Sequence, residues 1–153
     1  MVQVSSPTHY VAGFMFRDNR RQVALIRKTH PKWQMGKLNA IGGKVNAGEQ
    51  AYQAVVREFL EETSIRTTEW DWRCFATLKN PLRNGVVDFF VTDLSPLQDR
   101  VQTLESVTDE FVDWYNVKWL LSFSRRPMMD NLRWLIPMAR DESKVQASIL
   151  DPS

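Results

Sequence analysis

A short run of charged residues, Arg57, Glu58, Glu61 and Glu62, is the part of the sequence best suited to chemistry. On a helix, residues three and four positions apart share one face, so this spacing brings the three carboxylates together. Like charges at that spacing repel each other unless a positive group lies between them. Mg²⁺ and Mn²⁺ prefer carboxylate and phosphate oxygens as ligands. The spacing therefore predicts a divalent-cation site, with Arg57 orienting the glutamates.

Closely spaced glutamates on a helix usually form a solvent-exposed face. The residues before this run favour a functional site instead. Residues 38–44 indicate a short strand that enters a glycine turn, and residues 47–49 lead into the helix. The expected helix has an apolar face that includes Ala51, Val55 and Phe59. A strand, a glycine loop and an acidic helix together can form a cradle for a metal ion and a phosphate. Arg57 is expected to reach back to Glu49 or sideways to Glu61.

The same positions resemble the signature of the Nudix hydrolase family. That signature has a glycine, five residues, a glutamate, seven residues, Arg-Glu, an apolar residue, any residue, two glutamates, any residue, a glycine and an apolar residue. The matching residues are Gly43, Glu49, Arg57, Glu58, Phe59, Glu61, Glu62 and Ile65. Ser64 stands where the family has its second glycine. That glycine ends the helix in a left-handed conformation, so we expect an altered helix end or mild strain at Ser64.

The resemblance implies an α/β/α sandwich with a mixed sheet and a hydrolase that cleaves a diphosphate bond with Mg²⁺ or Mn²⁺. Glu58 and Glu62 are the first candidates for metal ligands, and Glu61 is either a third ligand or the base that takes a proton from water. Many members of the family add a glutamate from a later loop, and Glu110 is the candidate here. The full set of candidate catalytic and metal-binding residues is Arg57, Glu58, Glu61, Glu62, Glu110 and the carbonyl groups of Gly42 or Gly43.

The substrate is expected to be a small-molecule nucleotide, and the nearest resemblance is to MutT-like enzymes that sanitise oxidised purine nucleoside triphosphates. Trp33 could stack on a base, and Asn39 could bind its edge, with Lys44 nearby. Asp130 matches the first of two adjacent aspartates that contact the purine in the animal enzyme, whereas Asn131 replaces the second. Asp130 and Asn131 fit the N-cap of a following helix equally well. Hydrolysis of ADP-ribose or another nucleoside diphosphate derivative, and a non-catalytic nucleotide sensor, are the alternatives.

Whole-chain properties agree with a small enzyme. The 153 residues are expected to form a single domain, residues 1–153, which is long enough to bury a core without staples. The single cysteine, Cys74, excludes a disulfide within the chain and fits a reducing compartment. With no signal peptide and no apolar run long enough to span a membrane, the cytoplasm is the expected location. A net charge of +2 gives no indication of polymeric nucleic acid as a partner. Monomer and homodimer both stay open.

The elements that must position the site give an α+β fold class. Alternating and apolar patterns predict strands at residues 10–16, 23–27, 72–78 and 86–92, and a weaker one at 108–115. Residues 129–140 have helical periodicity through Leu132, Leu135, Ile136 and Ala139 and predict a closing helix. Pro137 is expected to kink or shorten that helix unless it begins nearby.

Overall fold

A mixed sheet of eight strands forms the centre of the computed structural model, which describes residues 6–122, 127–141, 143 and 146–150. The strands are β1 (Thr8–Arg17), β2 (Gln22–Arg27), β3 (Leu38–Asn39), β4 (Ile41–Lys44), β5 (Arg73–Asn80), β6 (Gly85–Asp93), β7 (Phe111–Asn116) and β8 (Ala147–Leu150). Their main order is β3-β2-β1-β6-β5-β8, with β4 paired to β1 and β7 to β2. The β1–β6 and β5–β8 pairs are parallel, and the other strand pairs are antiparallel.

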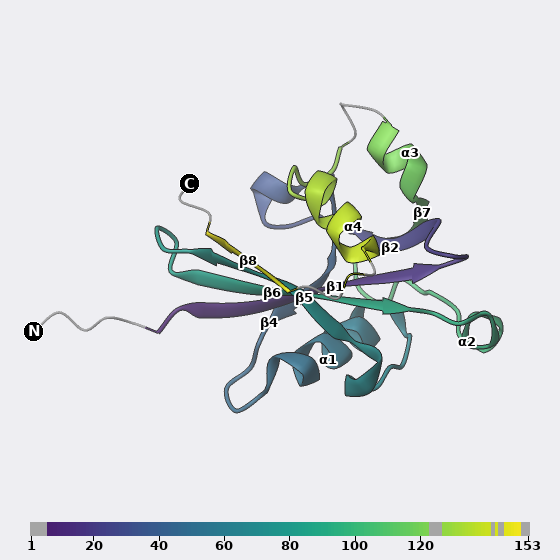
Figure 1. The fold of residues 1–153 in the computed structure, drawn as a ribbon, viewed down its shortest axis with the longest axis horizontal. Coiled ribbons are helices and arrows are strands. Elements are labelled where there is room, and N and C mark those ends of the chain that lie inside the picture. Colours follow the sequence, from purple (N-terminus) through teal and green to yellow (C-terminus); the bar gives the residue numbers. More distant parts are fainter. Residues whose placement is uncertain (1–5, 123–126, 142, 144–145, 151–153) are drawn as a thin grey trace, which may run out of the picture.

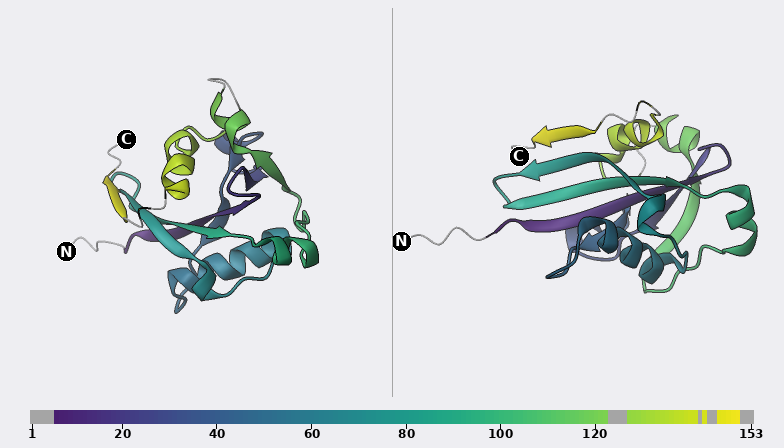
Figure 2. Two further views of the ribbon diagram at one scale, coloured as in Figure 1. Left: turned by 45° about the vertical axis from the view of Figure 1, so that its right-hand side comes forward. Right: turned by 60° about the horizontal axis from the view of Figure 1, so that its bottom comes forward.

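Helices cover both faces of this sheet. They are α1 (Ala51–Thr63), α2 (Pro96–Val101), α3 (Val117–Ser122) and α4 (Leu132–Arg140), with single 3-10 turns η1 (Lys32–Gln34) and η2 (Glu69–Asp71). Helix α1 lies on one side of the strands and α4 on the other (Figures 1 and 2). The expected sandwich of helices around a mixed sheet is therefore confirmed. None of the described helices has the length and apolarity needed to cross a membrane.

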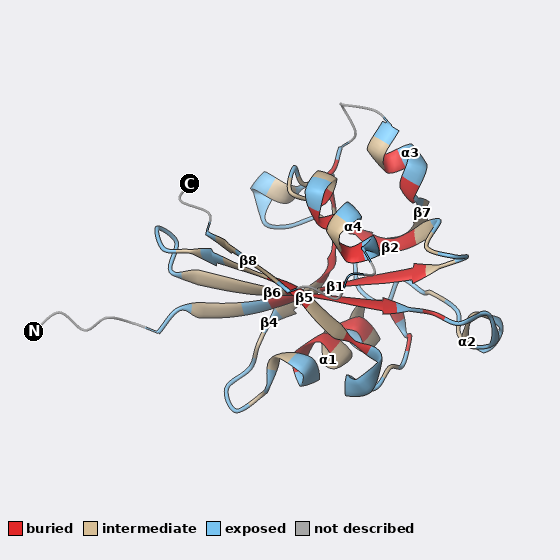
Figure 3. Cartoon of the chain, in the orientation of Figure 1, coloured by how far each residue is buried: buried red, intermediate tan, exposed pale blue. Residues whose placement is uncertain are grey.

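Each face of the sheet has its own apolar core because strand residues alternate between faces. On β1, Phe14 and Phe16 belong to the core under α4, whereas Val11 and Met15 belong to the core under α1. The buried residues lie along the central strands and on the helix sides that face them (Figure 3). The acidic helix is thus fixed to the sheet by the core on its own side.

The expected strands are present, and three local expectations need correction. Gly42 and Gly43 lie in β4 and not in a turn, while the turn with a positive φ is at Gly48 (φ 78°). The weak strand begins at Phe111, because residues 108–110 bend before it. The closing helix begins at Leu132, because the chain just before it pairs with β3. Pro137 lies inside this short helix without ending it.

Candidate active site

Helix α1 presents the acidic residues on one face and is held to the sheet by the other. Val55 and Phe59 on the inner face are fully buried. At the start of the helix, the Gln50 N–H donates to Gln53 Oε1 at 2.9 Å. At its end, Ser64 adopts the left-handed conformation with φ 65° and donates its N–H to the carbonyl of Leu60. Ser64 therefore ends the helix in the same left-handed conformation that a glycine would adopt. This conformation costs more free energy for serine than for glycine.

Arg57 holds the acidic side chains in place. Its Nε and Nη2 donate to the two carboxylate oxygens of Glu49 at 2.7 and 2.9 Å. Its Nη1 donates to Glu58 at 2.8 Å and to Glu61 at 3.2 Å, and Nη2 also donates to the carbonyl of Lys44 at 3.0 Å. The hydrogen bond from Arg57 lowers the pKa of the Glu49 carboxyl, and the same contact raises the pKa of the guanidinium. Both reaches of Arg57 expected from the sequence are present.

The two glycines of β4 allow the acidic helix and the sheet to approach each other closely. A Cβ atom on Gly43 would lie 2.4 Å from Oε1 of Glu58, so a side chain there would displace that carboxylate. A Cβ atom on Gly42 would lie 2.0 Å from the carbonyl oxygen of Val11 on β1. Gly42 is therefore required by strand pairing, whereas Gly43 makes room for a side chain of the site.

Glu58 and Glu62 are half-buried carboxylates that repel their neighbours. Burial raises the pKa of Glu58, and the charges of Glu61 and Glu49 add to that rise against the opposing contact with Arg57. Burial also raises the pKa of Glu62, with further contributions from Glu58 and Glu110, although Thr108 opposes the rise by donating its hydroxyl at 3.1 Å. Negative charge at this face is thus destabilised, and a cation would relieve it.

Glu110 lies in the bend before β7, close enough to Glu62 for their charges to interact. It is only 4% exposed and accepts hydrogen bonds from Lys28 Nζ at 2.8 Å and from the Thr29 N–H at 2.6 Å. Burial acts to raise the pKa of Glu110, but the hydrogen bonds from Lys28 and Thr29 outweigh burial and hold the pKa below its usual value. The later-loop glutamate singled out from the sequence therefore lies beside the acidic helix.

Glu61 differs from the other glutamates of the helix because its side chain is 56% exposed. Within the described residues, its hydrogen bond is the 3.2 Å contact with Arg57. A carboxylate that faces solvent in this way can meet a water molecule directly. The geometry is compatible with both roles considered for Glu61, a third metal ligand and a base.

The donor set fits Mg²⁺ or Mn²⁺ in its chemistry, although the side chains are not yet gathered around one point. Among the described residues, no three acidic, histidine or cysteine side chains lie close enough to hold a metal ion as they stand. The reason is that each carboxylate has a partner: Glu58 contacts Arg57, Glu62 contacts Thr108, and Glu110 contacts Lys28. Oxygen ligands and the mutual repulsion of the carboxylates suit a hard cation. Binding of an ion requires rotation of these side chains.

The candidate base-binding residues lie along β3 and the turn before it. Trp33 in η1 is 56% exposed. Asn39 donates its amide to Gln34 Oε1 at 3.0 Å and accepts the Ala40 N–H at 2.8 Å. Asn39 thereby ties β3 to the turn that carries Trp33. Lys44 lies elsewhere, at the end of β4: the residue is exposed, and its backbone carbonyl accepts a hydrogen bond from Arg57.

The segment before α4 joins this group by pairing with β3. The Leu38 N–H donates to the carbonyl of Pro127 at 2.8 Å, and the Met129 N–H donates to the carbonyl of Leu38 at 2.9 Å. Asp130 is exposed, whereas Asn131 occupies the N-cap position of α4 but makes no side-chain capping hydrogen bond. Within the described residues, Oδ1 of Asn131 is buried and has no hydrogen-bond partner. Asn131 therefore occupies the N-cap position, as expected, but its side chain does not cap the helix.

Sequence reasoning missed the residues that support the carboxylates. The contact of Lys28 with Glu110 was not foreseen from the sequence. Thr29 and Thr108 carried no expectation. Thr108 is 46 positions from Glu62, so no local pattern connects the two residues. The pairing of β7 with β2 brings Glu110 to Lys28 and Thr29, and the hydrogen bond from the Glu105 N–H to the Thr63 carbonyl attaches the segment before β7 to the end of α1.

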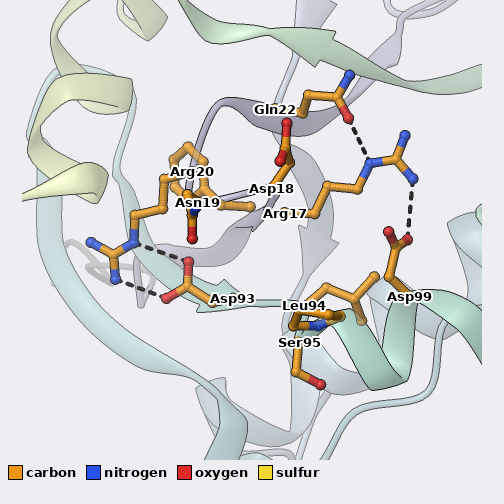
Figure 4. A pocket seen from close by; sticks show the side chains of 11 residues that line it. Arg17, Asp18, Asn19, Arg20, Gln22, Asp93, Leu94, Ser95 and Asp99 are labelled. Carbon is orange, nitrogen blue, oxygen red and sulfur yellow. Dashed lines mark hydrogen bonds and ion pairs between the residues drawn. The ribbon is translucent and has the colours of Figure 1, made fainter.

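A separate cleft of about 770 Å³ lies at the turn between β1 and β2, next to α2. Figure 4 shows Arg17 between Gln22 and Asp99, and Arg20 against Asp93. The candidate residues inferred from the sequence are not among the residues that line this cleft. The acidic helix therefore defines the site.

Comparison with known proteins decides the family of this chain. Residues 7–134 match the family described as NUDIX domain. The chain belongs to the Nudix family. The enzyme class expected from the sequence, a hydrolase acting on diphosphate bonds, is confirmed at the level of the family. No curated protein sequence matches this Nudix chain significantly.

Solved structures share the fold of this Nudix protein at low sequence identity. MutT from Aliivibrio salmonicida and Vibrio cholerae is 20% identical with a TM-score of 0.66, over 88% of this chain and 97% of the other. The NUDIX domain of Shewanella oneidensis NrtR, complexed with ADP ribose, is 19% identical with a TM-score of 0.71, over 90% and 88%.

A longer neighbour contains the same fold within a larger chain. The bifunctional NMN adenylyltransferase/ADP ribose pyrophosphatase from Francisella tularensis, complexed with AMP and a manganese ion, is 16% identical with a TM-score of 0.71. The match covers 90% of this chain and 42% of that one. Similarity at these identities concerns the fold, so the substrate has to be argued from this chain's own residues.

Proposed function

We propose that this protein is a divalent-cation-dependent pyrophosphohydrolase that converts purine nucleoside triphosphates to monophosphates and pyrophosphate. The observation that supports the substrate class is Oδ1 of Asn131, which is buried and has no hydrogen-bond partner among the described residues. An unpaired buried acceptor costs roughly 1–3 kcal/mol, and either a water molecule or a donor group of a ligand that reaches it would remove that cost. A purine offers N–H donors on its edge, and the exposed ring of Trp33 offers a stacking surface.

Asn131 also bears on whether the purine must be oxidised. An amide presents both a donor and an acceptor, whereas a carboxylate only accepts. Asn131 can therefore pair with more than one purine edge. We expect the enzyme to accept ordinary purine nucleoside triphosphates as well as oxidised ones.

The acidic face supplies the groups for hydrolysis. Glu58, Glu62 and Glu110 are the residues that would hold Mg²⁺ or Mn²⁺, with the carbonyl of Gly42 or Gly43 as a further donor. A bound cation would supply charge neutralisation on the diphosphate and would favour ionisation of the attacking water. Arg57 keeps Glu58 and Glu61 oriented through its hydrogen bonds. When the water oxygen attacks phosphorus and the bridging P–O bond breaks, exposed Glu61 is placed to accept the proton.

A panel of nucleotides with separated products tests the proposal. It contains ordinary and oxidised nucleoside triphosphates, ADP-ribose, dinucleoside polyphosphates, NADH and capped RNA, each with Mg²⁺ or Mn²⁺. We expect purine triphosphates to give the highest kcat/KM, with pyrophosphate as product. The Glu58→Gln variant purified in the same way is the control for contaminating phosphatases, and it should be inactive.

Two other outcomes of the panel would replace this function. Dominant hydrolysis of ADP-ribose would make the chain an ADP-ribose hydrolase and would remove the base-reading roles of Asn39 and Asn131. Tight nucleotide binding without turnover would make it a sensor. The single cysteine, Cys74, fits a reducing compartment, and we propose the cytoplasm as the location.

A further inference from the structure

The hydroxyl group of Thr108 connects two carboxylate-bearing segments of the site. It donates to Oε2 of Glu62 at 3.1 Å and accepts the backbone N–H of Glu110 at 3.2 Å. A threonine hydroxyl has one donor and two acceptor positions, so both hydrogen bonds can form at once. One side chain therefore fixes the carboxylate of Glu62 and the backbone from which Glu110 extends.

The connection matters because Glu62 and Glu110 repel each other. Both side chains are carboxylates, and the same Thr108 hydroxyl contacts Oε2 of Glu62 and the backbone N–H of Glu110. Glu110 is held from the other side by Lys28 and Thr29 at the end of β2. Glu62 has no cationic partner at hydrogen-bond distance among the described residues, and its hydrogen bond is the one from Thr108. Without that hydroxyl, the repulsion would drive the Glu62 side chain towards solvent.

The surroundings of Thr108 are ordered by further hydrogen bonds. The Val112 N–H donates to Oγ of Ser106 at 3.0 Å, and the Glu105 N–H donates to the carbonyl of Thr63 at 3.0 Å. These contacts attach the segment before β7 to the end of α1. Thr108 itself is exposed, so its hydroxyl is not needed to fill the core.

We propose that Thr108 is a positioning residue that holds Glu62 and Glu110 together for one divalent cation. The assignment rests on the proposed function, in which these two glutamates hold the metal ion. Thr108 would act through Glu62 and Glu110 and would contact neither the ion nor the nucleotide. Its removal should therefore weaken binding of the cation more than it slows hydrolysis once the cation is bound.

The test measures Mn²⁺ binding directly, by the electron paramagnetic resonance signal of free Mn²⁺, and separately measures hydrolysis. Thr108→Val keeps the branched shape and removes the hydroxyl, whereas Thr108→Ser keeps the hydroxyl. Thr103→Val, at an exposed threonine in the same connection between α2 and β7, is the matched control. Partners of metal ligands typically contribute about 10–100-fold to affinity, and we expect about 10-fold weaker Mn²⁺ binding in Thr108→Val.

The expected pattern has three parts. Thr108→Val needs about 10-fold more Mn²⁺ for half-maximal activity and recovers kcat within about twofold at saturation, since only positioning is lost. Thr108→Ser and Thr103→Val bind Mn²⁺ like the unchanged protein. In a Glu62→Gln background, Thr108→Val causes a smaller further loss than in the unchanged protein, because the contribution through Glu62 is already weakened and only the contact with the Glu110 backbone is left.

Wild-type Mn²⁺ affinity in Thr108→Val, or equal weakening in Thr108→Ser, would overturn the role of the hydroxyl. If Thr108→Val is unfolded by circular dichroism at the assay temperature, Thr108→Ala carries the same expectation. An unchanged protein that neither binds Mn²⁺ nor hydrolyses nucleotides overturns the proposed function and this role with it. If the unchanged protein binds Mn²⁺ and hydrolyses nucleotides, and Thr108→Val has the same Mn²⁺ affinity, only the role of Thr108 is overturned.

Discussion

Arg57 binds both carboxylate oxygens of Glu49, at 2.7 Å from Nε and 2.9 Å from Nη2. This contact fixes the plane of the guanidinium, and Nη1 of the same group donates to Glu58 and Glu61. Glu49 lies before α1, whereas the other glutamates lie on it. The loop that leads into the helix therefore determines how the acidic side chains on the helix are oriented.

Replacement of Arg57 by lysine should lower activity although the positive charge remains. An ammonium group cannot make the planar contact with Glu49 while also reaching Glu58 and the Lys44 carbonyl. We expect kcat/KM to fall about 10–100-fold, as for other residues that support metal ligands. The measurement is hydrolysis of the preferred nucleotide at saturating Mg²⁺. Arg66→Lys, at an exposed arginine just beyond α1, is the control, and an equal loss there would contradict the prediction.

The Glu49–Arg57 pair should make stability depend on pH in the acid range. The hydrogen bond from Arg57 lowers the pKa of Glu49 in the folded protein below its unfolded value of about 4.5. The stabilisation by this interaction is fully present above the pKa that Glu49 has in the unfolded chain. It is lost as the pH falls through the pKa that Glu49 has in the folded protein. The free energy of unfolding should thus be higher in the unchanged protein than in Glu49→Gln by up to about 1 kcal/mol at pH 7.

Urea unfolding of both proteins in a chelator, at pH 7 and at intervals down to pH 3, measures this difference. The difference should decrease below about pH 4.5, where the unfolded carboxyl becomes protonated. A difference that stays constant over this range would show that Glu49 stabilises the fold without its charge.

Measurements of Mn²⁺ affinity should distinguish the role of Glu61 from the roles of Glu58 and Glu62. Glu61 is the exposed member of the group, and its hydrogen bond among the described residues is the one with Arg57. We expect Glu61→Gln to keep Mn²⁺ affinity within a few-fold and to lose about 10²–10⁴-fold in kcat, as for a general base. Glu58→Gln and Glu62→Gln should weaken Mn²⁺ binding itself. Loss of Mn²⁺ binding in Glu61→Gln would instead assign it as a ligand.

Ser64→Gly should stabilise the protein. Ser64 has φ 65°, and this left-handed conformation costs serine roughly 1–2 kcal/mol, which glycine avoids at some cost in unfolded-chain entropy. We expect a net gain of about 0.5–1 kcal/mol in the free energy of unfolding by urea denaturation. Ser64→Ala retains the backbone cost and should show no gain. A glycine variant no more stable than the alanine variant would mean that Ser64 is not strained.

The helix α1 and most strands follow from local patterns, and the missed elements show where such patterns fail. The spacing of Val55, Phe59 and the glutamates specifies both faces of α1 without any tertiary information. The start of α4 depends on a contact with β3, and β8 pairs with a strand far away in sequence, so neither is visible locally. Helix α2 did have a signal, because Ser95 caps it and Pro96 begins it.

For the site, the sequence indicates the acidic residues but not the side chains that form hydrogen bonds with their carboxylates. Glu110 could be singled out only through the family resemblance. Its contact with Lys28 and the link from Thr108 to Glu62 depend on how β7 pairs with β2. The orphaned oxygen of Asn131 is likewise a result of packing, since an asparagine before a helix ordinarily predicts a cap.

Asn131→Leu should make the protein more stable and reduce its selectivity for purine over pyrimidine nucleoside triphosphates. The leucine removes a buried acceptor that lacks a partner, which should raise the free energy of unfolding by about 1 kcal/mol. Loss of the hydrogen bond to the base should lower kcat/KM for purine nucleoside triphosphates about 10-fold, equivalent to about 1.4 kcal/mol. Pyrimidine triphosphates should be affected less, so the preference for purines narrows. Urea unfolding and the ratio of kcat/KM for the two substrate classes measure both effects. Asn131→Asp keeps an acceptor oxygen and should keep the preference, whereas an unchanged preference in Asn131→Leu would mean that Oδ1 does not contact the base.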